Sequence, residues 1–341
     1  MTARAVARWQ AAAPYAVGLV AALGVLAVLV AALGGDAPAA VGSLVRASLG
    51  SAAGFGQTLN KTAPLLFGSV AVILGLRAGA FNIGVDGQIY AGAVAATGVA
   101  FLAAGLPKLL AVPAVLVAGA AGGALLGAVP GLLRARAGVS EIFVTVMLNF
   151  IALFFVEYLS TGPWNDPMAG EAITRAVPPS TTLPLLGARV GAHAGVLLAL
   201  AAALAVWWLL YRTVFGYEVR AVGDNPTAAR LGGIPVGRTV ALALVASGAL
   251  AGLAGAVEVS GFHYRLILGL SPGYGVMSIL IAVLSRRHPL VAIVASLGFA
   301  ALVVGTDSLQ RSVGLPASAV FVVQAAVLLV LLASEGLRRA P

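Results

Sequence analysis

Apolar runs of about 20 residues follow one another along almost the whole chain, and this pattern restricts its possible folds most strongly. A helix of about 20 apolar residues crosses the hydrocarbon core of a bilayer. In lipid, backbone N–H and C=O groups must be hydrogen-bonded within the protein, which allows only helices or closed barrels. The runs are rich in Ala and Leu and show no alternation of period two, so they predict helices. We therefore predict an all-α, polytopic membrane protein.

The runs divide the chain into about ten transmembrane helices, five on each side of a polar segment at 160–194. This arrangement predicts a single transmembrane domain over 1–341, built from two five-helix halves at 14–159 and 195–334. The first run is longer than the apolar core of a signal peptide, so we interpret it as an uncleaved helix. The predicted spans are 14–34, 60–76, 88–104, 110–129, 140–159, 195–211, 239–257, 274–285, 289–304 and 318–334.

The distribution of basic residues predicts the orientation. With a cytoplasmic N-terminus, thirteen basic residues fall inside and seven outside, counted between these spans. Cytoplasmic loops carry the excess of Lys and Arg, so both termini and the loop 212–238 are expected in the cytoplasm, and 160–194 outside. The basic residues lie singly between spans and form no continuous stripe, so the net charge of +9 does not predict nucleic-acid binding.

Several function classes are excluded by residues that are missing or scattered. The chain has no cysteine and three isolated histidines, so no metal site or thiolate nucleophile is predicted. Its only lysines, Lys61 and Lys108, follow Asn and Pro, whereas a phosphate-binding loop needs Gly-Lys-Ser/Thr. No group of residues suggests an enzyme, and no cofactor is expected. If ATP drives this protein, a separate chain must hydrolyse it.

One long polar stretch, "YEVRAVGDNPTAARLGG" at 217–233, lies in the predicted cytoplasmic loop. Asn225 is a good N-cap residue, and Pro226 suits the first position of a helix. The glycines at 232 and 233 then provide a stop with a left-handed cap, which we place at Gly232, so Gly232→Val is expected to misdirect the chain after the helix. The stretch therefore predicts a short helix that contacts a cytoplasmic protein, with an ordinary interfacial turn as the alternative.

Two polar, glycine-containing breaks occupy corresponding places in the two halves. Such paired breaks are the best sequence indication of a substrate path in a transporter. The first is 77–88, for which a tight cytoplasmic turn is the alternative; the second, at 271–273, precedes the short run 274–285. Ser271 is expected to cap that run and leave N–H groups facing a polar ligand. The candidate path residues in the breaks are Asn82, Asp86, Gln88, Ser271 and Tyr274.

The predicted span 140–159 carries three polar residues on one face. Glu141, Thr145 and Asn149 are four residues apart, and polar groups within a bilayer usually face a bundle interior or a cavity. We assign Thr145 and Asn149 to the substrate path. For each of them, a hydrogen bond between helices is the alternative.

Glycines recur at four-residue spacing on two predicted spans, at 119, 123 and 127 and at 248 and 252. Small residues at this spacing let helix backbones approach closely in a membrane. We therefore predict a helix-packing face at these positions, and no binding site.

Four stretches resemble the permease subunits of bacterial ABC importers. They are the stretch at 217–233, "RAGAFNIGVDGQIYAGA" (77–93), "SEIFVTVMLNFIAL" (140–153) and "LGLSPGYGVMSILIAVLSRRHPL" (268–290). The resemblance is to the family that serves branched-chain amino acids, simple sugars and nucleosides, and it is strongest to the nucleoside-uptake branch. That branch has glutamate where this chain has Asp86, so Asp86→Glu is expected to be tolerated.

The resemblance implies an ABC-importer permease fold and import of a nucleoside-like solute across the bacterial plasma membrane. A simple sugar, another small polar solute, or a secondary transporter that uses Asp86 remain alternatives. The implied partners are a cytoplasmic ABC ATPase, a second homologous permease in a heterodimer, an external solute-binding protein and the lipid bilayer; no nucleic acid is implied. The residues expected to couple to the ATPase are Asp224, Asn225, Pro226, Arg230 and Gly232.

Overall fold

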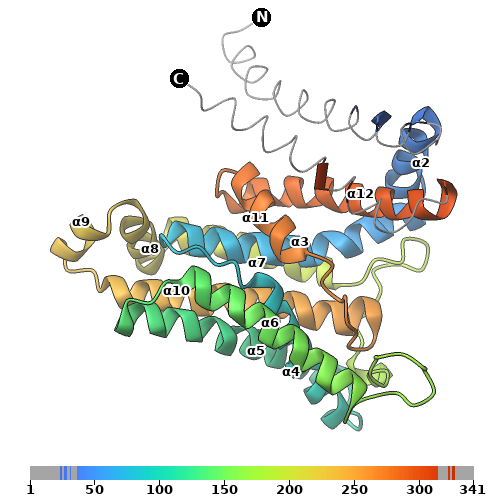
Figure 1. Cartoon of the computed structure of the whole chain (residues 1–341), viewed down its shortest axis with the longest axis horizontal. Helices are drawn as coiled ribbons and strands as arrows, with labels where there is room; N and C mark the ends of the chain where they lie inside the picture. Colours follow the sequence, from blue (N-terminus) through green and yellow to red (C-terminus); the bar gives the residue numbers. More distant parts are fainter. Residues whose placement is uncertain are drawn as a thin grey trace, which may run out of the picture. The chain divides into compact units, whose positions relative to one another are not determined.

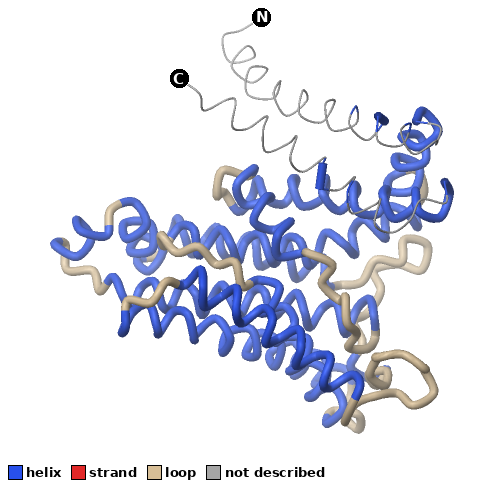
Figure 2. The backbone as a smooth tube through the Cα atoms, in the orientation of Figure 1, coloured by secondary structure: helices blue, strands red, loops and turns tan. Residues whose placement is uncertain are grey.

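The computed structural model describes residues 37–313 and a few isolated positions outside this range. Within the described part the chain is helical, and extended pairing is limited to three isolated bridges in the loops. Figure 2 shows helices joined by loops, without a strand. The predicted all-α class is therefore confirmed for these residues. The predicted spans 14–34 and 318–334 lie outside them.

Seven described helices are long and apolar enough to cross a membrane, and each coincides with a predicted span. The predicted span 274–285 is the helix α11, Tyr274–Leu284, whose 11 residues make it too short to cross a bilayer alone. The number of ten spans therefore stays a prediction. The seven are α3 (Ala52–Arg77), α4 (Val85–Leu102), α5 (Lys108–Ala137), α6 (Glu141–Thr161), α7 (Gly195–Arg212), α10 (Val236–Val257, continued to His263) and α12 (Pro289–Val313) (Figure 1).

Two described helices were not predicted. The helix α2, Ala37–Leu49, lies where we expected only a connection between spans. The helix α8, Val214–Asp224, precedes the predicted short helix in the loop 212–238. Its buried residues Gly216, Val219 and Val222 recur every three positions, which gives it one apolar face.

The chain divides into two compact units. One comprises Met1–Lys61 and Gly298–Pro341; its described part includes α2, in which Leu44 lies against Gly305 of α12. The other comprises Thr62–Leu297 and holds every described candidate site residue.

The second unit is organised around α4, α5 and α10, which contact one another (Figure 1). The predicted glycine face forms the contact between α5 and α10. A Cβ atom added to Gly123 would lie 2.6 Å from the Cα atom of Gly252, and one added to Gly127 would lie 3.2 Å from that of Gly248. The backbones touch directly because no side chains separate them, so the predicted packing role is confirmed.

The segment 160–194 is a packed loop rather than a free linker. The Thr174 N–H donates to Leu266 O at 3.1 Å, and the Leu183 N–H donates to Ser260 O at 2.8 Å. Ser260 belongs to the π-helix η2, Glu258–His263, that continues α10. These bonds fix the loop on the chain that follows α10.

Candidate substrate path and coupling loop

The two predicted breaks meet in the structure at Asp86. This residue lies in the first turn of α4, where its Oδ1 atom accepts hydrogen bonds from Ser271 Oγ at 2.6 Å and from Gly275 N at 2.8 Å. Gly273 has a φ of +83°, a left-handed conformation that starts α11 directly beside the carboxylate. One carboxylate therefore joins the start of α4 to the start of α11.

The expectation that Ser271 caps α11 and leaves N–H groups for a ligand is wrong in this structure. The N-cap is Gly273, which has no side chain of its own, and Ser271 donates to Asp86 instead of accepting from the helix. The carboxylate takes the Gly275 N–H because a negative charge is favoured at a helix N-terminus and accepts stronger hydrogen bonds than a hydroxyl. The ligand that we expected at this helix end is thus replaced by a side chain of the protein.

Asn82 and Gln88 form a buried amide pair beside this junction. Each side chain is only 1% exposed. Asn82 Nδ2 donates to Gln88 Oε1 at 2.9 Å and to Ser247 Oγ at 2.9 Å, and Ser247 Oγ donates to Ala71 O at 2.7 Å. Our sequence reasoning missed Ser247, although it is the only polar side chain away from the ends of the predicted span 239–257.

Asn149 holds the start of α4 from the side of α6. Its Oδ1 accepts from Gly87 N at 2.7 Å, and its Nδ2 donates to Ile83 O at 3.0 Å. These are bonds between segments, as in the alternative interpretation. Thr145 is buried beside Gly84 but donates to Ile142 O of its own helix, at 3.0 Å.

The structure thus brings five predicted path residues into one region around 82–88, which we call the polar core: Asn82, Asp86, Gln88, Asn149 and Ser271. Tyr274, at the start of α11, is fully buried next to this junction. The polar groups of the core bond mainly to one another and to the backbone. In this conformation they form a closed, internally satisfied cluster.

The loop 212–238, which we call the coupling loop after its predicted role, contains the predicted short helix. Asn225 Oδ1 accepts from Thr227 N at 3.1 Å and from Ala228 N at 3.0 Å, and Pro226 is the first helical residue of α9, Pro226–Leu231. The predicted start is confirmed. Asp224 ends α8 immediately before the cap, and the Asp224 and Arg230 side chains are exposed.

One detail of the predicted helix end is wrong. Gly232 has a φ of −77°, which any residue adopts, whereas Gly233 has a φ of +83°. The left-handed residue is therefore Gly233, one position after the predicted Gly232. The reason is that α9 continues to Leu231 and the Gly232 N–H still donates to Ala228 O at 2.9 Å.

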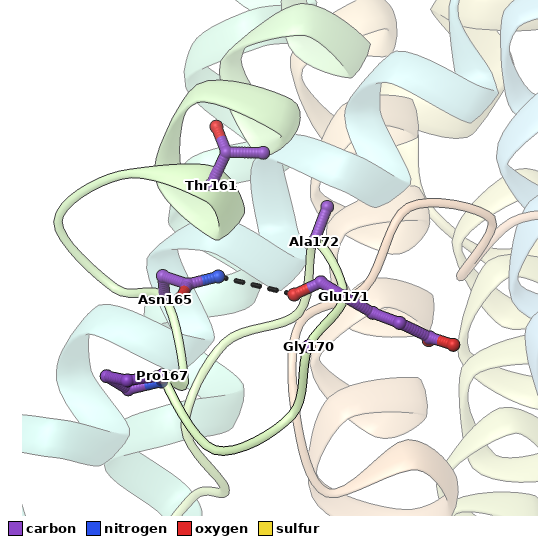
Figure 3. Close-up of a pocket in the computed structure, with 6 residues that line it drawn as sticks. All are labelled: Thr161, Asn165, Pro167, Gly170, Glu171 and Ala172. Atoms are coloured by element: carbon purple, nitrogen blue, oxygen red, sulfur yellow. Dashed lines mark hydrogen bonds between the residues drawn. The ribbon is translucent and has the colours of Figure 1, made fainter.

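A shallow hollow in the loop 160–194 does not coincide with any candidate site residue. Figure 3 shows its lining, across which Asn165 Nδ2 donates to Glu171 O at 3.3 Å. The hollow is lined by residues between 161 and 172, none of which belongs to the polar core. We assign it no part in the path.

Sequence comparison identifies the family of this helical membrane-type chain. Residues 54–332 match the model of the branched-chain amino acid transport system permease component, so the chain belongs to this family of ABC transporter permeases. It is a pore-forming subunit rather than an enzyme. No solved structure matches it significantly.

Three relatives are informative. The glucose ABC transporter permease protein TsgB13 of Haloferax volcanii is 34% identical over 98% of this chain and 91% of its own length. The guanosine ABC transporter permease protein NupP of Bacillus subtilis is 33% identical over 83% of this chain and 82% of its own. A second guanosine permease protein of that organism, NupQ, is 28% identical over 71% of this chain and 78% of its own.

Proposed function

We propose that this chain passes a nucleoside-like solute into the cytoplasm as one permease subunit of an ATP-driven importer. The observation that carries the coupling to ATP is α9, a six-residue helix that starts at a satisfied Asn225 cap. Within α9, Ala229 is buried, whereas Arg230 is exposed and Leu231 is 87% exposed. An apolar side chain held out beside a cationic one suits contact with another protein.

The nucleoside is proposed from two observations. The stretch that contains Asn82, Asp86 and Gln88 resembles the nucleoside branch, and two relatives carry guanosine in their names. Amide and carboxylate groups pair well with the donors and acceptors on a base edge. A relative named for glucose keeps a simple sugar as the second candidate.

Uptake into cells that carry the complete importer distinguishes the two solutes. We expect saturable uptake of labelled guanosine that excess unlabelled nucleoside abolishes and excess glucose leaves unchanged. A host lacking the permease gene provides the background. Glucose uptake without guanosine uptake would replace the nucleoside by the sugar and leave the rest of the proposal intact.

The importer is proposed to contain a second, different permease. In Bacillus subtilis, two permease proteins named for one solute both match this chain, at 33% and 28% identity. A cytoplasmic ATPase would contact α9, and an external solute-binding protein would supply the solute on the side of the loop 160–194. Transport then requires the closed polar core to open and close as the complex alternates between two states.

Orientation can be tested by cysteine labelling, because the natural chain has no cysteine. We expect Thr227→Cys to be protected from an impermeant thiol reagent in intact cells, and Ser180→Cys to react. Permeabilised cells provide the control, since both cysteines should then react. Labelling of Thr227→Cys from outside would reverse the orientation and remove α9 from the reach of an ATPase.

A further inference from the structure

The turn between α3 and α4 lies directly against the coupling loop. Gly223, near the end of α8, has no side chain, and its backbone contacts the carbonyl group of Arg77. A Cβ atom added at Gly223 would lie 2.9 Å from Arg77 C and 3.1 Å from Gly79 N. Real Cβ atoms are essentially never closer than 3.0 Å to another heavy atom, so a methyl group here would push the turn and α8 apart.

Apolar packing continues this contact to α9. Ala80, Val222 and Ala229 are buried in one cluster with Val240 and Leu244 of α10. Ala80 belongs to the turn, Val222 to α8 and Ala229 to α9. Because packed interiors have few voids, a displacement of α9 displaces its neighbours in this cluster.

Polar bonds also hold the same turn. Arg134 Nη2 donates to Gly79 O at 3.1 Å, the Phe81 N–H donates to Glu141 Oε1 at 3.1 Å, and Arg134 forms an ion pair with Glu141. Asn82, which follows Phe81 in the sequence, belongs to the polar core. The turn thus contacts α8 and the apolar cluster that includes Ala229 of α9, and it is also bonded to the Arg134–Glu141 pair. In the sequence it leads directly into the polar core.

We propose that the turn 79–83 transmits movement of α8 and α9 to the polar core, with Gly223 and the Arg134–Glu141 pair as positioning residues. The inference rests on the proposed function, since it assumes that an ATPase moves α9. It assigns a route to that movement: from Ala229 and Gly223 to the turn, and from the turn through Asn82 to the bonds with Gln88 and Ser247.

The test measures ATP hydrolysis and solute uptake in vesicles that contain the complete importer. In Gly223→Ala the exposed residues of α9 are unchanged, so we expect the ATPase to co-purify and to hydrolyse ATP. We expect solute uptake per ATP hydrolysed to fall by about fivefold or more, as for a lost coupling between two sites. Gly237→Ala is the matched control, because its added methyl would lie at an ordinary 3.4 Å from Ala135 Cβ.

A second variant keeps the proposal testable if Gly223→Ala fails to assemble. Glu141→Gln retains the size of the side chain and removes the ion pair with Arg134, so it should also lower uptake per ATP hydrolysed while the ATPase stays bound. Uptake per ATP at the level of the natural protein in an assembled Gly223→Ala, or in Glu141→Gln, would overturn the assigned route. Failure of the natural chain to bind any ATPase would instead overturn the proposed function.

Discussion

Replacement of Asp86 by alanine should reduce solute uptake to the background of a strain that lacks the permease. The change removes the carboxylate oxygen that accepts from both the Ser271 hydroxyl and the Gly275 N–H. A hydrogen bond to a charged group contributes about 1.5–3 kcal/mol, and a buried donor left without a partner costs about 1–3 kcal/mol. The starts of α4 and α11 would then separate, while the surface of α9 is unaffected.

Uptake and ATPase co-purification, measured on the same preparations, test this expectation. Glu157→Ala is the control, because Glu157 is an exposed carboxylate on α6 outside the polar core. Asn149→Ala should lower uptake less, since it removes the bonds to Gly87 of α4 and to Ile83 but leaves the junction with α11. Uptake by Asp86→Ala at the level of the natural protein would show that this junction is not needed for transport.

Asp86→Glu separates charge from fit. The resemblance to the nucleoside branch predicts that glutamate is tolerated, because it retains the carboxylate acceptor. The carboxylate is tightly packed, since a Cβ atom added to Gly275 would lie 2.7 Å from Asp86 Cγ. We expect Asp86→Glu to retain most of the uptake. Because the site is tightly packed, α11 must then shift to admit one more methylene group.

Arg230→Glu is expected to abolish stable association with the ATPase without affecting insertion in the membrane. Arg230 is exposed in the last turn of α9, where a cation is also favoured by the helix dipole. A charged hydrogen bond to an acidic groove of the partner is worth about 1.5–3 kcal/mol. Its loss alone weakens binding about tenfold or more, since each 1.4 kcal/mol is a factor of ten, and charge reversal adds repulsion.

The measurement is co-purification of the ATPase, followed by hydrolysis and uptake in vesicles. Arg136→Glu is the matched control, because Arg136 is an exposed arginine in the last turn of α5, outside the coupling loop. Gly233→Val should also impair coupling, because a β-branched residue resists a φ of +83°. Gly232→Val should be milder than the sequence predicted. Equal ATPase binding by Arg230→Glu and the natural chain would show that α9 is an ordinary interfacial turn and not the contact with the ATPase.

The sequence by itself determined the features that depend on local chemistry. Apolar runs predicted the helices because a span satisfies its own backbone hydrogen bonds. Asn225 and Pro226 predicted the start of α9 because capping involves only neighbouring residues, and the glycine rows predicted a helix-packing face, which the structure places between α5 and α10. The helix α8 was missed because its 11 residues are too few to span a membrane and lie between two predicted spans.

Only the tertiary structure decided which polar groups meet. Burial obliges Asp86 to find partners, because an unpaired buried charge is costly, but spacing along the chain does not identify them. Ser271 is 185 residues away, and Ser247 reaches Asn82 only because α10 packs beside α4. Likewise, Gly223 meets Arg77 at the end of α3 and Gly79 of the turn through packing of whole helices. Such non-local contacts depend on the arrangement of every helix at once, which no local pattern of residues specifies.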